Sequence, residues 1–458
     1  MKNPFEKNWT NYNNGVPLED EEVSRLISVV PSGAQFRLSQ RPFYLFVHFG
    51  MNTATGREWG SGTEKCSDFT IKKVKPKQWV KCAQVAGATG IILTCKHHDG
   101  FCLWHSDYTD FSVKNTDFGQ DIVKLTADAC HEAGLDFGIY VSPWDMHEKS
   151  YGTSAYDNYF CNQLTELLGN YGEISEVWFD GAKGANARAC EYDWQRYYQV
   201  VRDLQPQANI AVCGPDIRWV GNESGKTRKT EYSVVPKYLQ NAEIIAHSSQ
   251  KAEGEAVKSL TSKDEDLGSR AVLAGESELC WYPAEVDVSI RDGWFWNKND
   301  NRTVKSGKKL FDIYLNSVGN NCTLLLNVPP TVKGVFHRKD VRALKNLGKR
   351  VEALYSKPVI VEKLGALSKD DEFIDFNFDA PKKLKYVSIS ENILFSQRVE
   401  AFDIYLKKIN GKYTKAYSGT AIGSKKLACL GGKACVGARL VIRQSRGTPM
   451  LSEIGFYE

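Results

Sequence analysis

One carboxylate at the end of an apolar run is the most suggestive chemical group in this chain. Residues 175–182, SEVWFDGA, are mostly apolar and aromatic until Asp180, and a glycine follows. This pattern predicts a buried strand that delivers one charged side chain to the edge of a sheet. In a parallel α/β barrel the carboxyl ends of the strands carry the chemistry, so Asp180 is a candidate catalytic group. The alternative is a helix N-cap, since Asp also starts helices after short loops.

Polar and aromatic residues accompany the ends of the other apolar runs as well. In chain order they are His48, Glu58, Trp59, His97, His98, Asp99, Tyr140, Trp178, Asp216 and Glu223. Because the carboxyl ends of parallel strands meet at one edge of a sheet, groups at five successive ends are expected to line a single pocket. Hydrogen-bonding groups beside tryptophans suit a ligand with several hydroxyl groups and an apolar face, such as a sugar.

The sequence His97-His98-Asp99 also raises the possibility of a metal site. Adjacent histidines on an extended strand point to opposite faces, which disfavours two bonds to one ion. No HxH or HExxH spacing supports a metal, so a metal-dependent hydrolase is the weaker hypothesis. One of the two histidines could instead be a capping or core residue.

These groups must be positioned by alternating strands and helices. Strands are expected at 43–50, 90–95, 137–142, 175–179 and 209–213, with later ones near 277–282, 310–317 and 324–328. Helices are expected at 18–29, 77–86, 121–133, 156–168, 194–204 and 338–355. This order predicts the α/β class and a (β/α)8-like barrel. Residues 222–280 are expected to form long loops over the mouth of the barrel.

A second domain is expected after the last of these helices. From about residue 358 the segments are short and rich in β-forming residues, as in 386–390, 402–406 and 438–442. We therefore predict a catalytic barrel domain over 1–355 and a C-terminal antiparallel β-sandwich over 356–458. We expect the sandwich to brace the barrel, although Tyr413 and Tyr417 could help it to bind glycan.

Composition excludes several classes of partner. A formal net charge of +4, from 59 basic and 55 acidic residues, gives no indication of nucleic acid or of a membrane surface as a partner. The twelve cysteines form no CxxC pair and are expected to be mostly buried thiols. Residues 1–9 show no apolar leader, and no stretch approaches 18 apolar residues. We expect a soluble protein, either cytoplasmic or exported with a signal peptide outside this numbering; its oligomeric state stays open.

Four motifs together resemble a known family. They are 48–50 (HFG), 58–60 (EWG), 96–101 (KHHDGF, followed by Trp104 and Ser106) and 178–181 (WFDG). Their order and spacing, from about residue 40 to 335, resemble the α-L-fucosidases of glycoside hydrolase family 29. Residues 214–223, 281–285 and 320–330 resemble the subgroup that acts on α1,3- and α1,4-linked fucose in branched glycans.

The resemblance implies a retaining exo-hydrolase of fucosylated oligosaccharides that needs no cofactor and no metal. It implies Asp180 as the nucleophile and Glu223 as the acid/base, with Glu285 as the second choice. The residues that it implies for substrate binding are His48, Glu58, Trp59, His97, His98, Tyr140, Trp178, Glu285, Arg291 and Trp296. The family pattern has proline where this chain has Asp292, which affects the shape of that loop.

Two alternatives remain beside the leading hypothesis. One is a fucosidase of broad specificity that also accepts α1,2-linked and aryl fucosides. The other is a fucose-binding protein without activity, which the presence of both candidate carboxylates, Asp180 and Glu223, disfavours.

Overall fold

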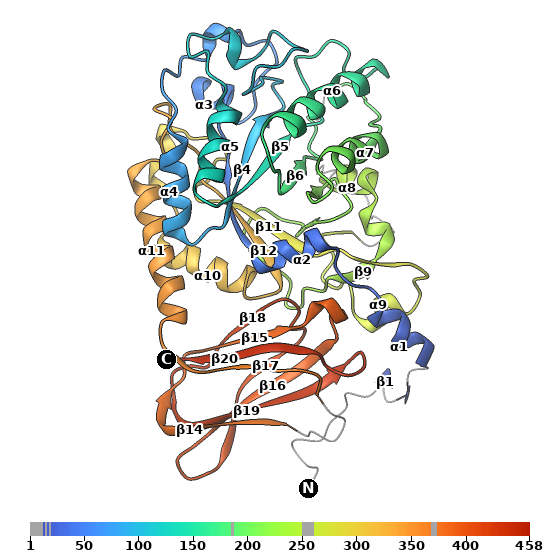
Figure 1. The fold of residues 1–458 in the computed structure, drawn as a ribbon, viewed down its shortest axis with the longest axis vertical. Coiled ribbons are helices and arrows are strands. Elements are labelled where there is room, and N and C mark those ends of the chain that lie inside the picture. Colours follow the sequence, from blue (N-terminus) through green and yellow to red (C-terminus); the bar gives the residue numbers. More distant parts are fainter. Residues whose placement is uncertain (1–11, 14–15, 18–19, 185–186, 250–260, 368–372) are drawn as a thin grey trace.

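Eight parallel strands form a nearly closed barrel in the computed structural model, which describes residues 12–13, 16–17, 20–184, 187–249, 261–367 and 373–458 (Figure 1). Around the barrel the strands run in the order β7-β6-β5-β4-β3-β12-β11-β8. They are β3 (Phe43–Val47), β4 (Gly90–Lys96), β5 (Asp136–Val141), β6 (Glu176–Phe179), β7 (Asn209–Val212), β8 (Arg218–Trp219), β11 (Ala284–Ser289) and β12 (Cys322–Asn327). The predicted fold class is confirmed.

Helices cover the outside of the barrel. The long ones are α4 (Pro76–Ala86), α5 (Ile122–Glu132), α6 (Ala155–Asn170), α7 (Trp194–Leu204), α10 (Gly307–Ser317) and α11 (Arg338–Tyr355). Shorter helices of the chain are α1 (Asp20–Ile27), α2 (Gly33–Gln40) and α3 (Met51–Thr55), of which α1 packs with Val234, Leu273 and Trp281 and not on the barrel strands. The chain passes from β7 to β8 through residues 213–217 without a helix.

Local sequence explains where these elements begin and end. Strands β3 and β4 are buried along their whole length, because the barrel interior covers one face and helices cover the other. The side chain of Asp121 accepts a hydrogen bond from the backbone of Lys124 and caps α5. Pro76 opens α4, and Gly87, with φ of 83°, closes it.

Of the two later strands expected in the middle of the chain, the one near 310–317 is wrong, and the one near 277–282 is present but lies outside the barrel sheet. The apolar run 310–317 lies in helix α10, where Ser306 caps the first turn. The run 277–282 contributes β10 (Leu279–Trp281), which pairs with β9 (Val234–Pro236) in a separate two-stranded sheet. The barrel strand is instead β11, which carries two carboxylates among its apolar residues.

Much of the segment 222–280 lies away from the mouth of the barrel. It contains α8 (Ala242–Ser249) and α9 (Arg270–Leu273), and Arg270 pairs with Glu400 of the C-terminal unit at 2.7 Å. Figure 1 shows α9 and β9 toward the C-terminal sheets, at the end opposite to the loops above α3. Residues 250–260 of this segment, like residues 1–11 at the chain start, lie outside the described part.

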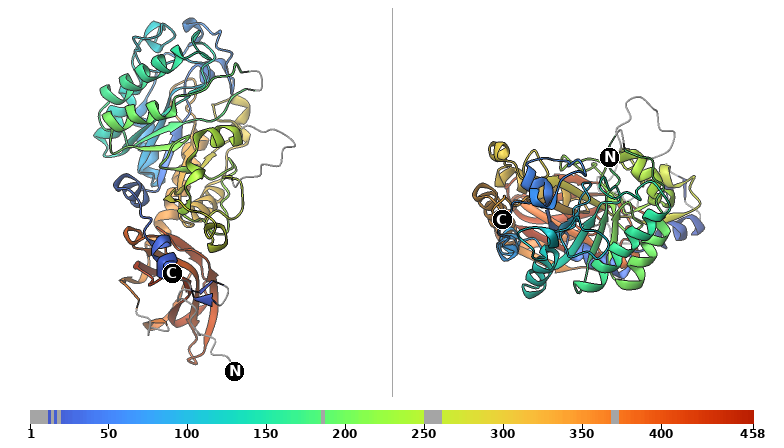
Figure 2. Two further views of the ribbon diagram at one scale, coloured as in Figure 1. Left: turned by 90° about the vertical axis from the view of Figure 1, so that its right-hand side faces the viewer. Right: turned by 90° about the horizontal axis from the view of Figure 1, so that it is seen from above.

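Two four-stranded antiparallel sheets pack face to face after α11. One has the order β13-β20-β15-β18 and the other β14-β19-β16-β17. Their strands are β13 (Pro358–Lys363), β14 (Ile374–Lys383), β15 (Tyr386–Glu391), β16 (Val399–Lys407), β17 (Tyr413–Gly419), β18 (Lys426–Cys429), β19 (Ala434–Ser445) and β20 (Leu451–Tyr457). Figure 2 shows this sandwich below the barrel. Asn321 of the barrel accepts a hydrogen bond from the backbone of Ser424 at 2.8 Å, which ties the two units together.

Two further expectations can be compared with the structure. Most of the twelve cysteines are buried, and all are free thiols. Of the helices in the described residues, none combines the length and the apolar character needed to cross a membrane.

Candidate active site

A pocket opens at the carboxyl ends of the barrel strands. Its cavity measures about 120 Å³. The lining side chains are Phe46, His48, Glu58, Trp59, His97, His98, Tyr140, Trp178, Asp180, Ala182, Val212, Trp219, Glu223, Asp287 and Trp294. Most of the residues singled out in the sequence therefore meet in one place, although they are spread over more than 170 positions of the chain.

Asp180 is held in a fixed orientation at this pocket. The Tyr140 hydroxyl donates a hydrogen bond to Oδ2 at 2.7 Å, and the backbone N–H of Ala182 donates to Oδ1 at 2.9 Å. The side chain is 21% exposed, so it can still meet a ligand. The next long helix, α7, is capped by Asp193, which rules out the helix-cap interpretation of Asp180.

The rings of His97 and His98 both line the pocket, with their centroids 4.1 Å apart. The expectation that they point to opposite faces is wrong, because β4 ends at Lys96 and the backbone turns at these two residues. Burial lowers the pKa of His98 to about 4 and that of His48 to about 3, and it also lowers the pKa of His97. All three imidazoles are therefore neutral near pH 7.

Hydrogen bonds fix which nitrogen carries the proton in two of these rings. Ser142 donates its hydroxyl hydrogen to the Trp144 carbonyl at 2.7 Å, so it accepts from Nδ1 of His98, also at 2.7 Å. His48 donates from Nδ1 to the amide oxygen of Asn327 at 2.9 Å. In both rings Nε2 is consequently a hydrogen-bond acceptor, which suits a ligand hydroxyl. In His98 this atom lies 3.7 Å from Oδ2 of Asp180.

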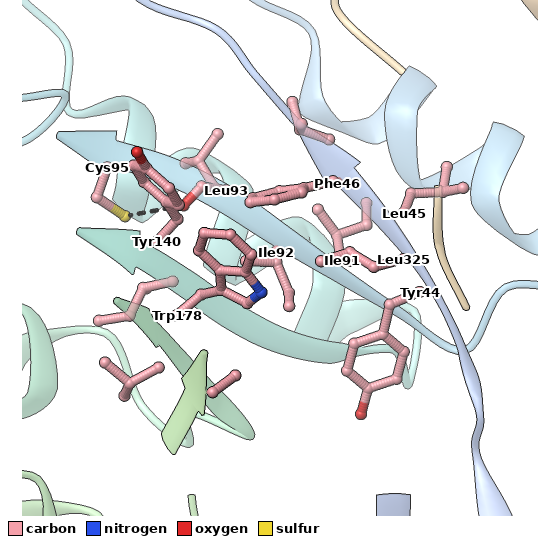
Figure 3. Packing of buried hydrophobic residues seen from close by; sticks show 14 of the residues in the cluster. Tyr44, Leu45, Phe46, Ile91, Ile92, Leu93, Cys95, Tyr140, Trp178 and Leu325 are labelled. Carbon is pink, nitrogen blue, oxygen red and sulfur yellow. Dashed lines mark hydrogen bonds between the residues drawn. The ribbon is translucent and has the colours of Figure 1, made fainter. Parts of the chain in front are cut away.

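Aromatic rings form one wall of the site. Tyr140 and Trp178 stack with centroids 5.4 Å apart, and Phe46 lies 5.3 Å from Trp178. Figure 3 shows these three rings close to one another, among the aliphatic side chains of β4. Such a surface can cover an apolar face of a bound sugar while the neighbouring polar groups contact its hydroxyls.

Glu223 enters the pocket from a tight turn. The turn lies between Gly221 and Gly225, which have φ of 103° and 73°. Asn222 accepts hydrogen bonds from the backbone and hydroxyl of Ser224, and Trp294 Nε1 lies 3.4 Å from the Glu223 carboxylate. The glycines thus shape a hydrogen-bonded turn that carries Glu223.

Six lining residues were not predicted as site residues: Phe46, Ala182, Val212, Trp219, Asp287 and Trp294. Trp219 donates from its indole to Asp287 at 2.8 Å. Burial, together with the nearby charge of Glu223, raises the pKa of Asp287 well above its ordinary value. The backbone N–H of Trp294 donates to Glu58 at 2.8 Å and fixes that carboxylate. The alternation of carboxylates and valines in 284–289 is the only sequence signal for Asp287.

Three predicted residues lie outside the lining: Glu285, Arg291 and Trp296. Glu285 is buried beneath the pocket and accepts a hydrogen bond from the Trp178 indole at 2.9 Å, so it braces the site and is not placed to meet a leaving group. Arg291 is buried against Asp340 at 2.8 Å instead of lining the rim.

The loop after β11 explains why this chain can lack the expected proline. The backbone N–H of Asp292 donates to the Thr303 hydroxyl at 3.1 Å, a bond that proline could not make. The indole nitrogen of Trp296 is buried next to this loop and has no hydrogen-bond partner within the described structure. Asp216 pairs with Arg202 at 2.6 Å and supports the barrel wall, away from the pocket.

In the part of the chain that the structure describes, no group of three or more His, Cys, Asp or Glu side chains is arranged to hold a metal ion. The chemistry available at the pocket is that of carboxyl groups and neutral imidazoles.

Comparisons with known proteins agree with this site. The family model of the α-L-fucosidases matches residues 63–353. Alpha-L-fucosidase 1 of Arabidopsis thaliana is 35% identical over 464 residues, which cover 93% of this chain and 87% of that protein. The crystal structure of a glycoside hydrolase 29 family member from an unknown rumen bacterium is 34% identical, with a TM-score of 0.80 over 94% of this chain and 77% of its own.

A structure in complex with fucose is also similar. It is a Ruminococcus gnavus family 29 fucosidase, 30% identical, with a TM-score of 0.79 over 94% of this chain and 95% of its own. The family model covers the barrel strands from β4 to β12, and the plant relative and the rumen structure extend over 93% and 94% of the chain. This chain belongs to glycoside hydrolase family 29 and is an α-L-fucosidase.

Proposed function

We propose that this α-L-fucosidase is an exo-acting, retaining enzyme that releases α1,3- and α1,4-linked fucose from branched oligosaccharides. The fixed, partly exposed carboxylate of Asp180 carries the proposal. The small size of the cavity supports exo action: about 120 Å³ is below the roughly 300–1,000 Å³ of pockets that enclose larger ligands. One terminal sugar can enter while the rest of the glycan stays outside.

In the proposed reaction Asp180 attacks the anomeric carbon of fucose. At the same time the protonated carboxyl of Glu223 gives its proton to the glycosidic oxygen, the carbon–oxygen bond breaks and the rest of the glycan leaves. A water molecule then attacks the anomeric carbon of the fucosyl-enzyme, and Glu223 takes the proton of that water. The bond to Asp180 breaks, and fucose leaves with its original anomeric configuration.

Neighbouring residues suit the two roles. Tyr140 and the Ala182 amide both donate hydrogen bonds to Asp180 and so hold its carboxyl group in one orientation. Glu223 is exposed at the rim beside Trp294, where a leaving sugar can reach it. His48 and His98, as acceptors at Nε2, are proposed to bind fucose hydroxyls, and Trp178 to cover its apolar face.

The linkage preference is supported by the resemblance of 214–223 and 281–285 to the α1,3/1,4 subgroup. In the structure Trp219 and Glu223 are the members of these segments that line the pocket, whereas Asp216 and Glu285 support the barrel and Trp281 packs in a separate cluster. Trp219 is therefore proposed to contact the sugar that carries the fucose.

Fucose release from three substrates tests this function: a Lewis-type trisaccharide, an α1,2-fucosylated lactose and an aryl α-L-fucoside. We expect rapid release from the trisaccharide and slow release from the other two, and proton NMR should show α-L-fucose as the first product. Equal rates on all three would overturn the linkage proposal, and β-L-fucose as the first product would overturn the retaining mechanism.

A further inference from the structure

A second cavity lies at the junction of the barrel and the sandwich. It measures about 500 Å³ and is bordered by α10, by residues 224–229 and by strands β17 and β18. Figure 1 shows α10 above β18, with the junction between them. The lining begins at Ser224, directly after Glu223, but it shares no residue with the pocket of Asp180. We call this cavity the junction groove.

The junction groove is positively charged. Lys226, Lys229, Lys309 and Lys426 line it together with Arg228. The arginine pairs with Glu231 at 3.1 Å, and the one lining carboxylate, Asp312, pairs with Lys308 at 2.9 Å. None of the four lysines has a carboxylate partner among the described residues. A ligand in this groove is therefore expected to be negatively charged.

Lys426 is the most informative of these cations, since it is only 6% exposed. Its ammonium group donates to the amide oxygen of Asn320, a neutral acceptor. Burial lowers the pKa of Lys426 to about 8, which leaves it mostly charged near pH 7. The charge of Glu231 acts on Lys426, but that carboxylate is already paired with Arg218 and Arg228. Buried cations are normally paired with an anion, and a negatively charged ligand in the groove would give Lys426 a partner of its own.

Other lining residues favour a sugar over a free inorganic ion. Tyr417, from β17, offers a partly exposed ring, and Asn316 and Thr227 add polar groups. An aromatic face beside amides and hydroxyls suits the mixed apolar and polar surface of a sugar ring. The turn that carries Glu223 also borders the groove. Asn222 accepts a hydrogen bond from the backbone N–H of Ser224 at 3.1 Å and donates one to the carbonyl of Lys226 at 3.0 Å, and both of these residues line the groove.

We propose that the junction groove is a second carbohydrate site, which binds an acidic sugar that carries a carboxylate or a sulfate group. The proposal rests on the glycosidase family of the chain but does not depend on the linkage that the enzyme cleaves. It gives the sandwich a part in binding, through Tyr417 and Lys426, besides its bracing role.

Calorimetric titration of the full chain with fucose-free probes tests the proposal. The probes are sulfated N-acetyllactosamine, sialylated N-acetyllactosamine, the neutral parent disaccharide and inorganic sulfate. We expect at least one acidic disaccharide to bind about tenfold more tightly than the neutral one, as for a gain of charge-assisted hydrogen bonds. Saturating L-fucose should not displace it, because fucose occupies the other pocket.

Matched variants separate a site from general charge attraction. The double variant Lys229→Gln, Lys309→Gln should bind the acidic probe about tenfold more weakly. The control Lys345→Gln, Lys349→Gln on α11 removes the same amount of charge, and its affinity for the probe should change by less than about twofold. The rate of aryl fucoside hydrolysis should be unchanged in both double variants. A failure of the catalytic proposal would appear in that rate, and a failure of the binding proposal would appear in the affinity for the acidic probe. Equal losses in both variants, equal binding of the neutral probe, no binding of either acidic probe, or equally tight binding of inorganic sulfate would each overturn the proposal.

Discussion

The indole N–H of Trp178 donates a hydrogen bond to Glu285 at 2.9 Å, across the interior of the barrel. Trp178 in turn stacks on Tyr140, whose hydroxyl holds Asp180. A buried carboxyl on β11 thus supports, through two aromatic rings, the carboxylate at the end of β6. This relationship gives Glu285 a role in the site although it does not line the pocket.

The first prediction concerns this support. Glu285→Leu removes the acceptor of the buried Trp178 N–H, and an unsatisfied buried donor costs about 1–3 kcal/mol. We expect kcat/KM for an aryl fucoside to fall about tenfold or more, mainly through kcat, as Asp180 loses its alignment. Glu285→Gln keeps an acceptor oxygen and is the matched control. Equal activity of the Leu variant and wild type would show that the support is not needed.

The second prediction concerns the pH dependence of stability. Burial raises the pKa of Glu285 from 4.5 to about 7, so the folded chain binds this proton more tightly than the unfolded chain. The stabilising contribution is complete below pH 4.5 and is lost as the pH rises through about 7. Buried neutral histidines have the opposite effect at acid pH, so the comparison must be made between wild type and a variant.

Urea denaturation at pH 5 and pH 8 measures this effect. We expect the free energy of unfolding of wild type to fall more over this range than that of Glu285→Gln, by up to about 3 kcal/mol. Parallel pH profiles of the two proteins would contradict the assignment of a shifted proton to Glu285.

The third prediction concerns Glu223. If it protonates the leaving oxygen, Glu223→Ala should slow release from a natural glycan by about 10²–10⁴-fold, the usual contribution of general acid catalysis. For an aryl fucoside, which has a good leaving group, the rate of the fucosylation step should fall much less. Glu223→Gln, which cannot give up a proton but keeps the shape, should behave like the Ala variant. An equal loss of rate on both substrates would show that another residue acts as the general acid.

Much of the barrel could be predicted because its buried strands are continuous apolar runs. Strand β6 ends just before Asp180, and the change from the apolar Val177 and Phe179 to a charged residue identified this carboxylate as a candidate. Strand β11 has no such contrast, because Glu285 and Asp287 lie inside it. Their burial depends on Trp178 and Trp219, which come from other strands, and no local pattern reveals such partners.

Long-range partners also explain the errors about the rim. The sequence placed Arg291 there, but its guanidinium pairs with Asp340, 49 positions along the chain. The run 310–317 contains enough apolar residues for a strand or a helix. It forms a helix because Ser306 caps its first turn and because its apolar face packs against α11. The junction groove depends on two domains meeting, which the sequence of either domain alone does not show.

The role of Asp180 is the central claim, and a trapped intermediate tests it most directly. The enzyme is mixed with a 2-deoxy-2-fluoro-fucosyl fluoride, which slows the breakdown of a glycosyl-enzyme, and the protein is digested and analysed by mass spectrometry. We predict one fucosyl adduct, on the peptide that contains Asp180, and none in Asp180→Ala, whose turnover should fall about 10⁴-fold with the fold intact. An adduct on another residue, or near-normal activity of the Ala variant, would contradict the account.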